Sequence, residues 1–553
     1  MPGRCEIVGR TLTAKRTTYV TLGLLLLAAA ALQIYYRAKL GWLDDDWEFI
    51  FFRTNTPWDE IFTPHNSHMV VLPAAIFKLY ISVFGLGEVL PMHVFSTAMY
   101  LLSAVVLFFW MRPLVGDGAS LIGCAMILFL GAAYEDLLWA FQIGFTIPIA
   151  AGLGGLIMLR GETARGDLIG CGLLVVAVLG SDMGLMPVAG AAVALLFRKR
   201  RRLVDAYVVL VPVAVYAGWW LGWGHEVNSA ISSDNLVGAP EYVWNAYRSV
   251  VAALTGTFEI EGDAGTWISA LLALALAAAI AARLIVIRRV PAQFLVGAAC
   301  AVVFWSLAAL NEGDFGRYNE SRYLYPGAVF LLMAIAGAFE GVILAGRRLA
   351  LLAALVIVPI AVNVLALRDG YYEVFSNHFD TEMASATATE VGRPAIPPDT
   401  LVTVAFYIMP AEYFHAVIDE SGKAGWSLEE IPEQSEYART TIDKQLIATL
   451  PVSIRETTRP RPGRPDARCE TVDPSAAPAP LELQGDEFTV TPEGDVQVAL
   501  GRFATDTPNV IGPVTAGSTA VVRIPADLSP TPWRAAFIGE GEVEVCQTGE
   551  PAG

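Results

Sequence analysis

The sequence predicts an all-α polytopic membrane bundle of about 11 transmembrane helices, followed by a C-terminal extracytoplasmic region with an α/β segment and a β-sandwich-like module. Three observations predict this fold class. Apolar residues make up 55% and charged residues only 16% of the 553 positions, unlike soluble proteins. Apolar runs alternate with basic clusters as far as residue 368. Beyond it, 12 Lys plus Arg stand against 29 Asp plus Glu, so the formal charge of −17 belongs to this region.

The apolar runs set the expected topology, because a helix needs about 20 mostly apolar residues to cross hydrocarbon. Basic residues lie at every second junction, including the "RKRRR" stretch at 198–202. The positive-inside rule then places residues 1–17 in the cytoplasm, and an odd number of crossings places the C-terminal region outside. The predicted runs are 18–36, 91–111, 119–133, 138–159, 168–180, 184–197, 203–223, 267–287, 292–310, 326–344 and 349–367.

We therefore expect a multi-pass plasma-membrane protein with a membrane domain at 18–368 and an outer loop at 38–90. The first run could instead be the apolar stretch of a signal peptide, but its length and the spans that follow favour an uncleaved anchor. Residues 68–85 are also apolar. Counting them as a crossing would reverse every later loop, so we predict an amphipathic helix on the outer membrane face.

The C-terminal region predicts three parts. Residues 369–458 form an α/β segment, with strand-like residues at 399–409 and a short helix at 410–421. A Pro and Arg-rich linker at 459–468 precedes a β-rich module at 469–553. Cys469 and Cys546 are its two cysteines, and in an oxidising compartment we expect a disulfide between them rather than two free thiols. The acidic charge argues against nucleic acid as a partner.

Acidic residues recur at the predicted outer ends of the spans. "LDDDWEFIFF", residues 43–52, follows the first span, "YEDLL" places Glu135 and Asp136 between two later spans, and Asp182 lies on the same side. The runs at 119–133, 168–180 and 184–197 are too short to cross as straight helices, which predicts a polar cavity dipping into the membrane. Carboxylates at such depth usually serve a site. For Asp182 we favour the alternative, an interfacial carboxylate in water.

These carboxylates and a late pair of arginines suggest a site for a phosphate. Two or three carboxylate oxygens from Asp45, Asp46, Glu135 and Asp136 could hold a divalent cation such as Mg²⁺ or Mn²⁺. In the last outer loop, "GRYNESRYLYPG" brings Arg317 and Arg322 next to tyrosines, and an arginine can bind phosphate through two parallel hydrogen bonds. His65 and His68 lie three residues apart in the first outer loop, where we expect structural or substrate contacts before metal binding.

This layout resembles the GT-C class of membrane glycosyltransferases, which use sugars carried on polyprenyl phosphate. That class has an acidic pair in the first outer loop, here Asp45 and Asp46 followed by Trp47. It also has an amphipathic helix after that loop, here "HMVVLPAAIFKLYISVFG", then paired short spans and a late element similar to "RYLYP" at 322–326. The resemblance covers residues 18–367, and "YEDLLWAFQIGF" is similar to a stretch of uncharacterised actinobacterial relatives.

The resemblance implies transfer of one hexose or pentose from a polyprenyl-phosphate donor to an acceptor hydroxyl of an envelope glycan or protein. Asp45 would be the general base, usually with inversion, although three consecutive aspartates leave Asp44 as an alternative. Further roles implied are a catalytic or metal-binding role for Asp46, metal or acceptor binding by Glu135 and Asp136, donor-phosphate binding by Arg322, Arg317 and Tyr323, and substrate contacts from His65, His68 and Trp47.

Two other classes of function fit part of the pattern. A transporter or flippase for a lipid-linked sugar would use the same charges to bind cargo, but it should carry charges or broken helices near the bilayer midplane and often inverted repeats. A membrane-anchored envelope scaffold would leave the first-loop aspartates idle. An Asp45→Asn variant would then behave as wild type.

Overall fold

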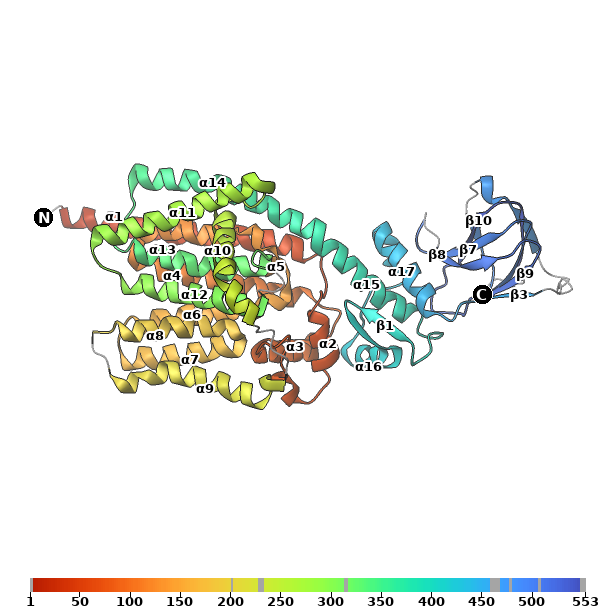
Figure 1. Cartoon of the computed structure of the whole chain (residues 1–553), viewed down its shortest axis with the longest axis horizontal. Helices are drawn as coiled ribbons and strands as arrows, with labels where there is room; N and C mark the ends of the chain where they lie inside the picture. Colours follow the sequence, from red (N-terminus) through yellow and green to blue (C-terminus); the bar gives the residue numbers. More distant parts are fainter. Residues whose placement is uncertain are drawn as a thin grey trace. The chain divides into compact units, whose positions relative to one another are not determined.

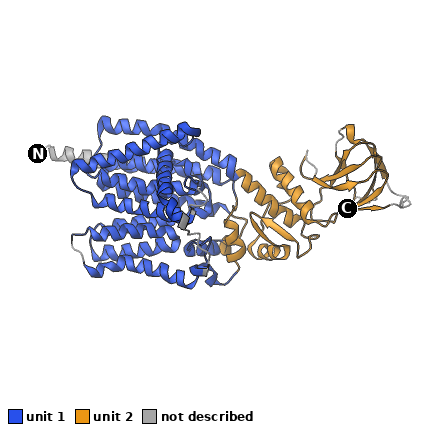
Figure 2. Cartoon of the chain, viewed as in Figure 1, with its two compact units in different colours: residues 1–40, 56–80, 89–375 blue, residues 41–55, 81–88, 376–553 orange. Residues whose placement is uncertain are grey.

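The structure is a computed structural model that describes residues 3–199, 202–226, 233–312, 317–457, 468–476, 480–505 and 509–547. The chain forms two compact units (Figure 2). Unit 1 comprises residues 1–40, 56–80 and 89–375. Unit 2 comprises residues 41–55, 81–88 and 376–553. The aspartate run at 44–46 therefore belongs to the same compact unit as the C-terminal region.

The described residues of unit 1 form helices joined by turns and loops, with an isolated β-bridge between His65 and His68. Its principal helices are α1 (Gly3–Arg37), α3 (Val71–Phe84, of which residues 71–80 belong here), α4 (Leu90–Leu128), α5 (Tyr134–Leu138), α6 (Ile143–Leu159), α7 (Ala164–Gly180), α8 (Leu185–Leu196), α9 (Tyr207–Gly222), α10 (Ser233–Thr255), α11 (Gly262–Ile287), α12 (Ala292–Glu312), α13 (Ser321–Ala338) and α14 (Gly346–Asp369). A π-helix, η8 (Gly370–Phe375), follows α14.

Eight helices among the described residues are long and apolar enough to cross a membrane: Arg16–Arg37, Leu90–Leu128, Ala140–Leu159, Leu203–Gly222, Gly262–Ile287, Ala292–Asn311, Ser321–Ala338 and Gly346–Val391. Each of the eleven predicted runs overlaps helical residues. The prediction of an all-α multi-pass membrane bundle is thus confirmed. The crossing count of eleven stays a prediction, and so does the orientation.

Two differences from the predicted helices have local causes. The runs at 91–111 and 119–133 begin in one continuous helical segment, α4, which is kinked at Gly116 (φ 80°, ψ 173°). A left-handed φ of this kind is accessible to glycine without strain. The second difference is α10, a helix that was not predicted because its apolar residues lie on one face among polar ones and form no continuous run.

Helices α6, α7, α8 and α9 pack against one another as a cluster (Figure 1). Glycines permit their close approach: a Cβ on Gly155 of α6 would lie 3.0 Å from the backbone oxygen of Gly170 of α7. Such small residues allow helix backbones to pack closely where lipid supplies no hydrophobic drive for association. This packing fixes the ends of α7 and α8, between which Asp182 lies.

Unit 2 begins with α2 (Asp46–Arg53) and continues after the bundle with α15 (Ser376–Val391), β1 (Leu401–Val404), β2 (Tyr407–Pro410), α16 (Ala411–Ser421) and α17 (Glu436–Thr449). The helix predicted at 410–421 is α16. The strand-like stretch at 399–409 is an antiparallel hairpin, in which Leu401 pairs with Pro410 and Val404 pairs with Tyr407. The chain reverses at Ala405, whose φ is 53°.

The β-rich module consists of two antiparallel sheets, with orders β5-β10-β7-β8 and β3-β9-β6-β11-β4. The strands are β3 (Ser453–Thr457), β4 (Arg468–Val472), β5 (Leu481–Glu482), β6 (Glu487–Pro492), β7 (Val496–Gly501), β8 (Asn509–Val514), β9 (Thr519–Arg523), β10 (Arg534–Gly539) and β11 (Val543–Gln547). The predicted linker lies outside the described residues apart from Arg468. Because β3 precedes it and β4 follows it, both sides of the linker contribute to one sheet.

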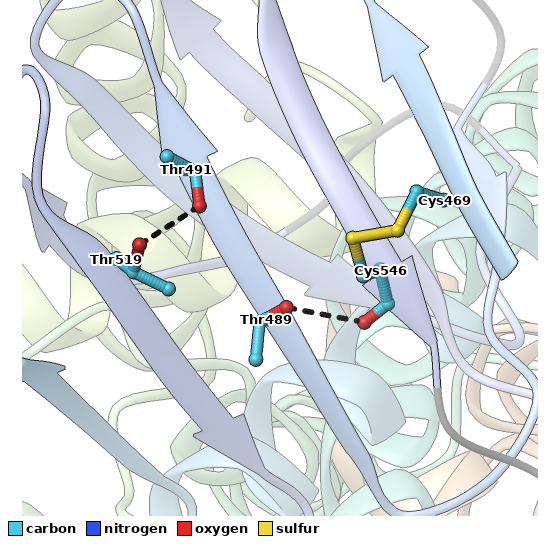
Figure 3. The surroundings of a disulfide bond; sticks show 5 residues. All are labelled: Cys469, Thr489, Thr491, Thr519 and Cys546. Carbon is cyan, nitrogen blue, oxygen red and sulfur yellow. Dashed lines mark hydrogen bonds between the residues drawn. A yellow bond between two sulfur atoms is a disulfide. The ribbon is translucent and has the colours of Figure 1, made fainter. Parts of the chain in front are cut away.

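Cys469 and Cys546 form a disulfide, as predicted. They are direct register partners on β4 and β11, and their Cα atoms are 4.0 Å apart (Figure 3). On the same face, Thr491 of β6 and Thr519 of β9 are joined by a hydrogen bond of 3.0 Å. The bridge links the edge strand β4 to its neighbour.

Candidate functional site

The second acidic pair lies on a short, folded connection between α4 and α6. Residues 131–142 form the turns η2 (Gly131–Ala133) and η3 (Ala140–Gln142) around α5, which carries Glu135 and Asp136. Asn363 of α14 fixes the start of this connection, because its Oδ1 accepts a 3.0 Å hydrogen bond from the Ala132 N–H. A Cβ at Gly131 would overlap the backbone oxygen of Asn363, so this close approach requires glycine.

A buried arginine fixes the other end of the connection. Arg37, at the end of α1, donates from Nε to the Leu137 carbonyl at 2.6 Å and from Nη2 to the Asp136 carbonyl at 3.4 Å. Its side chain is fully buried. A guanidinium with several backbone acceptors suits such a position, since it presents five donors in a rigid plane. The acidic pair is thereby held by helices from both ends of unit 1.

The late arginines lie next to this acidic pair within unit 1. Ser321, the first residue of α13, accepts a 3.1 Å hydrogen bond from the Glu135 N–H, and α5 packs against α13. Glu320 contacts both arginines: its Oε2 is 2.7 Å from Arg322 Nη2, and its Oε1 is 3.3 Å from Arg317 Nε. The Arg322 guanidinium is 5.4 Å from the centre of the Tyr323 ring. A phosphate reaching Arg322 would have to compete with Glu320.

Asp136 carries the most unusual carboxylate of this cluster. It is fully buried, and both of its side-chain oxygens are without a hydrogen-bond partner among the described residues. Buried polar groups are almost always hydrogen-bonded, so such a group calls for a specific explanation. Two available carboxylate oxygens suit a hard cation or a ligand hydroxyl. However, no third His, Cys, Asp or Glu side chain in the described part of unit 1 completes a metal-binding group with Glu135 and Asp136.

His68 and Asp182 form a contact that the sequence did not predict. The Asp182 carboxylate lies 2.9 Å from His68 Nδ1 and accepts a 3.0 Å hydrogen bond from the Met69 N–H. His65 and His68 close a tight turn through reciprocal backbone hydrogen bonds of 3.0 and 2.7 Å. The two central residues, Asn66 and Ser67, have positive φ values. Asp182 therefore holds the turn at residues 65–68 against the connection between α7 and α8.

Within unit 2, the three consecutive aspartates have different surroundings. Asp44 is half-buried, and its Oδ1 is 3.8 Å from His378 Nδ1. Asp45 is half-buried and accepts a 3.1 Å hydrogen bond from the Tyr407 hydroxyl. Asp46 is fully buried, and its Oδ2 accepts a 3.0 Å hydrogen bond from the Leu43 N–H at the start of α2. Of the three, Asp46 is the one whose carboxylate stabilises its own turn.

Glu382 of α15 approaches this run from 338 residues away in sequence. Its Oε2 accepts hydrogen bonds of 3.0 Å from the Asp44 N–H and 3.0 Å from the Trp47 indole N–H, and its Oε1 is 3.2 Å from the Asp44 nitrogen. Trp47, predicted to contact substrate, is fully buried here. Burial raises the pKa of Glu382, the neighbouring Asp44 carboxyl raises it further, and the N–H donors offset this only in part.

Glu382, His378 and Tyr407 were not among the predicted site residues. His378 and Tyr407 have pKa values that are also raised, His378 mainly by its contact with Asp44 and Tyr407 mainly by burial. The one available signal was a lone group of titratable residues, "HFDTE", in a helix otherwise rich in Ala, Ser and Thr. The aspartate run belongs to unit 2 and the Glu135, Asp136 and Arg322 cluster to unit 1.

Comparison with known proteins gives the following. No protein-family profile and no curated protein matches the chain. Among solved structures, the chain is similar to ArnT from Cupriavidus metallidurans bound to undecaprenyl phosphate, with 12% sequence identity, a TM-score of 0.44, and coverage of 71% of this chain and 84% of that one. It is also similar to the arabinosyltransferase EmbB from Mycobacterium smegmatis, with 13% identity and a TM-score of 0.32. That match covers 96% of this chain and 65% of EmbB.

Proposed function

We propose that this protein is a membrane glycosyltransferase that moves a sugar from a polyprenyl-phosphate donor to a hydroxyl of an extracytoplasmic acceptor, such as an envelope glycan or protein. The observation that carries the proposal is the hydrogen bond from the Glu135 N–H to Ser321, which places the connection with the second acidic pair next to the start of α13, where Arg322 lies. A cation-accepting carboxylate next to a phosphate-binding arginine is what departure of a lipid phosphate requires. The multi-pass membrane fold gives a lipid-linked donor access.

The aspartate run supplies the base in this mechanism. Asp45 takes the proton of the acceptor hydroxyl while the hydroxyl oxygen attacks the anomeric carbon of the sugar. The bond from that carbon to the phosphate oxygen breaks, and the configuration at the carbon is inverted. Asp45 suits this role because its carboxylate is half-buried, whereas that of Asp46 is buried and bonded to the Leu43 N–H. Arg322 stabilises the charge that develops on the departing phosphate.

A divalent cation, when bound, would further neutralise that phosphate. Asp136 and Glu135 of unit 1 would hold it; Asp46, the third ligand implied by the resemblance, belongs to unit 2. The two oxygens of Asp136 that have no hydrogen-bond partner among the described residues support this assignment. Cys469, Glu544 and Cys546 also lie within reach of one another, but the disulfide removes both thiolates as ligands.

The test is a transfer assay with the purified full-length protein in liposomes and a panel of sugars on undecaprenyl phosphate. Wild type is compared with Asp45→Asn and Arg322→Ala, with and without EDTA. Exposed Asp59→Asn, in the same outer loop, and exposed Arg289→Ala serve as matched controls. We expect both site variants to lose transfer at least about 100-fold, with donor binding retained in Asp45→Asn.

Three outcomes would refute all or part of the proposal. Wild-type transfer by the Asp45→Asn variant would exclude Asp45 as the base, and no transfer from any donor by wild type, without movement of lipid, would favour a scaffold. Movement of labelled lipid across the bilayer, without product from any donor, would instead establish a transporter.

A further inference from the structure

The contacts of Glu382 assign a role to the C-terminal region, and this inference rests on the proposed function. We propose that Glu382 is a positioning residue that holds the aspartate run in shape, so that Asp45 and not Asp44 presents its carboxylate to the acceptor. It would act through the backbone and through Trp47 rather than by touching substrate.

The first step is the convergence of donors on one carboxylate. The Asp44 N–H and the Trp47 indole N–H both reach Glu382, and these residues lie on either side of Asp45 and Asp46. The Glu382 side chain is buried, with the residue only 4% exposed. Burying a carboxyl group is costly unless hydrogen bonds compensate for lost hydration, so these contacts are specific and not incidental.

The second step concerns the backbone of the run. Asp44 has a φ of 46°, in the left-handed region that non-glycine residues seldom occupy. Such a conformation persists only where surrounding contacts enforce it. The Glu382 carboxylate accepts the N–H of this same residue, so it stabilises the turn that directs residues 44–46.

The third step separates Asp44 from Asp45. The Asp44 side chain faces Glu382 and His378, whereas the Asp45 side chain contacts the hydroxyl of Tyr407 on β2. The Asp44 carboxylate lies against the ring of His378, so it is less available to an acceptor hydroxyl. The arrangement therefore favours Asp45 as the base.

The test has a structural arm and a kinetic arm, both on the full-length protein. Hydrogen–deuterium exchange is followed in peptides covering residues 43–47 for Glu382→Ala, Glu382→Gln, Trp47→Phe and the exposed control Glu420→Gln. We expect faster exchange in Glu382→Ala, a smaller increase in Glu382→Gln, whose amide oxygen retains one acceptor, and none in the control. Unchanged exchange in Glu382→Ala would overturn the proposal.

In the kinetic arm, we expect kcat to fall about 10- to 100-fold in Glu382→Ala with the donor KM within about twofold of wild type, because misplacing the base affects chemistry more than donor binding. Glu382→Gln should recover part of the loss. Adding Trp47→Phe to Glu382→Gln should cost less than the sum of the single effects, since the two share one contact. Asp44→Asn should retain more activity than Asp45→Asn. The reverse order, or faster exchange with unchanged kcat, would refute the positioning role.

The two arms also separate this proposal from the proposed function. If wild type transfers no sugar from any donor, the proposed function fails, and with it the catalytic meaning of Glu382. The exchange measurement then still decides whether Glu382 holds the run. If Glu382→Ala does not fold, as judged by its thermal midpoint, Glu382→Gln and Trp47→Phe decide both arms.

Discussion

Removing the bridge between Cys469 and Cys546 should destabilise the β-rich module by a predictable amount. The two cysteines are 77 residues apart in sequence, so the bridge closes a loop of about 78 residues. In the chain-entropy model this is worth about 4.5 kcal/mol at 25 °C. Small domains have only about 5–15 kcal/mol of stability in total, so the loss is a large share.

The position of β4 makes this module depend on the bridge. β4 is one of the two edge strands of the five-stranded sheet, and among the described residues it pairs with β11 alone. Four of its five residues are exposed, so little apolar burial holds it in place. We therefore expect β4 to detach first after reduction, and its partner β11 to become the new edge.

The assay is pulse proteolysis of the full-length protein in urea, with and without dithiothreitol. With an m-value of about 1–3 kcal/mol per molar urea, the loss corresponds to a midpoint lower by roughly 1.5–4.5 M. The Cys469→Ser/Cys546→Ser double variant should match reduced wild type and show no further change on reduction, which controls for other effects of the reductant. Equal midpoints for oxidised and reduced wild type would refute the reasoning.

Three further predictions follow from other contacts. Glu320→Gln should tighten binding of undecaprenyl phosphate several-fold, since Arg322 no longer pairs with a carboxylate; unchanged or weaker binding in a liposome assay would count against Arg322 as the phosphate ligand. Because the pKa of Glu382 is raised, folded unit 2 binds more protons than the unfolded chain. The stability of unit 2 should therefore fall as pH rises from about 4.5 through the pKa of the folded state. Glu382→Gln should flatten the profile of thermal midpoint against pH across that range. Asp182→Asn should loosen the turn at His68 by about 1 kcal/mol, seen as faster limited proteolysis at that turn, and unaltered cleavage would argue that the contact is dispensable.

The helical bundle was predictable because each membrane helix requires an apolar run that can be recognised in the sequence. An apolar run of sufficient length specifies a span wherever the rest of the chain lies, and α11 and α12 follow this rule closely. The disulfide was predictable for a similar reason, since only two cysteines lie in the region after residue 369. Local signals were enough in both cases.

The candidate site was less accessible to sequence reasoning because its contacts are long-range. Glu382 looks like any acidic residue of a polar helix, and nothing near it in sequence indicates that its partners are Asp44 and Trp47. Glu320 and Arg322, which form an ion pair, are only two positions apart in sequence. Two arginines beside tyrosines nevertheless suggested a phosphate ligand more strongly than an ion pair. The burial of charged residues and their long-range pairing are therefore the features of a site that a single sequence does not predict.

Unit 2 is assembled from two short early stretches and a long late one, which has a consequence for biogenesis. Asp44 leaves the ribosome 338 residues before Glu382, a delay of roughly 17–68 seconds at about 5–20 residues per second. Throughout that interval the aspartate run lacks the residue that fixes its turn. An incompletely synthesised copy would therefore carry its acidic loop without this stabilising contact until Glu382 has been made.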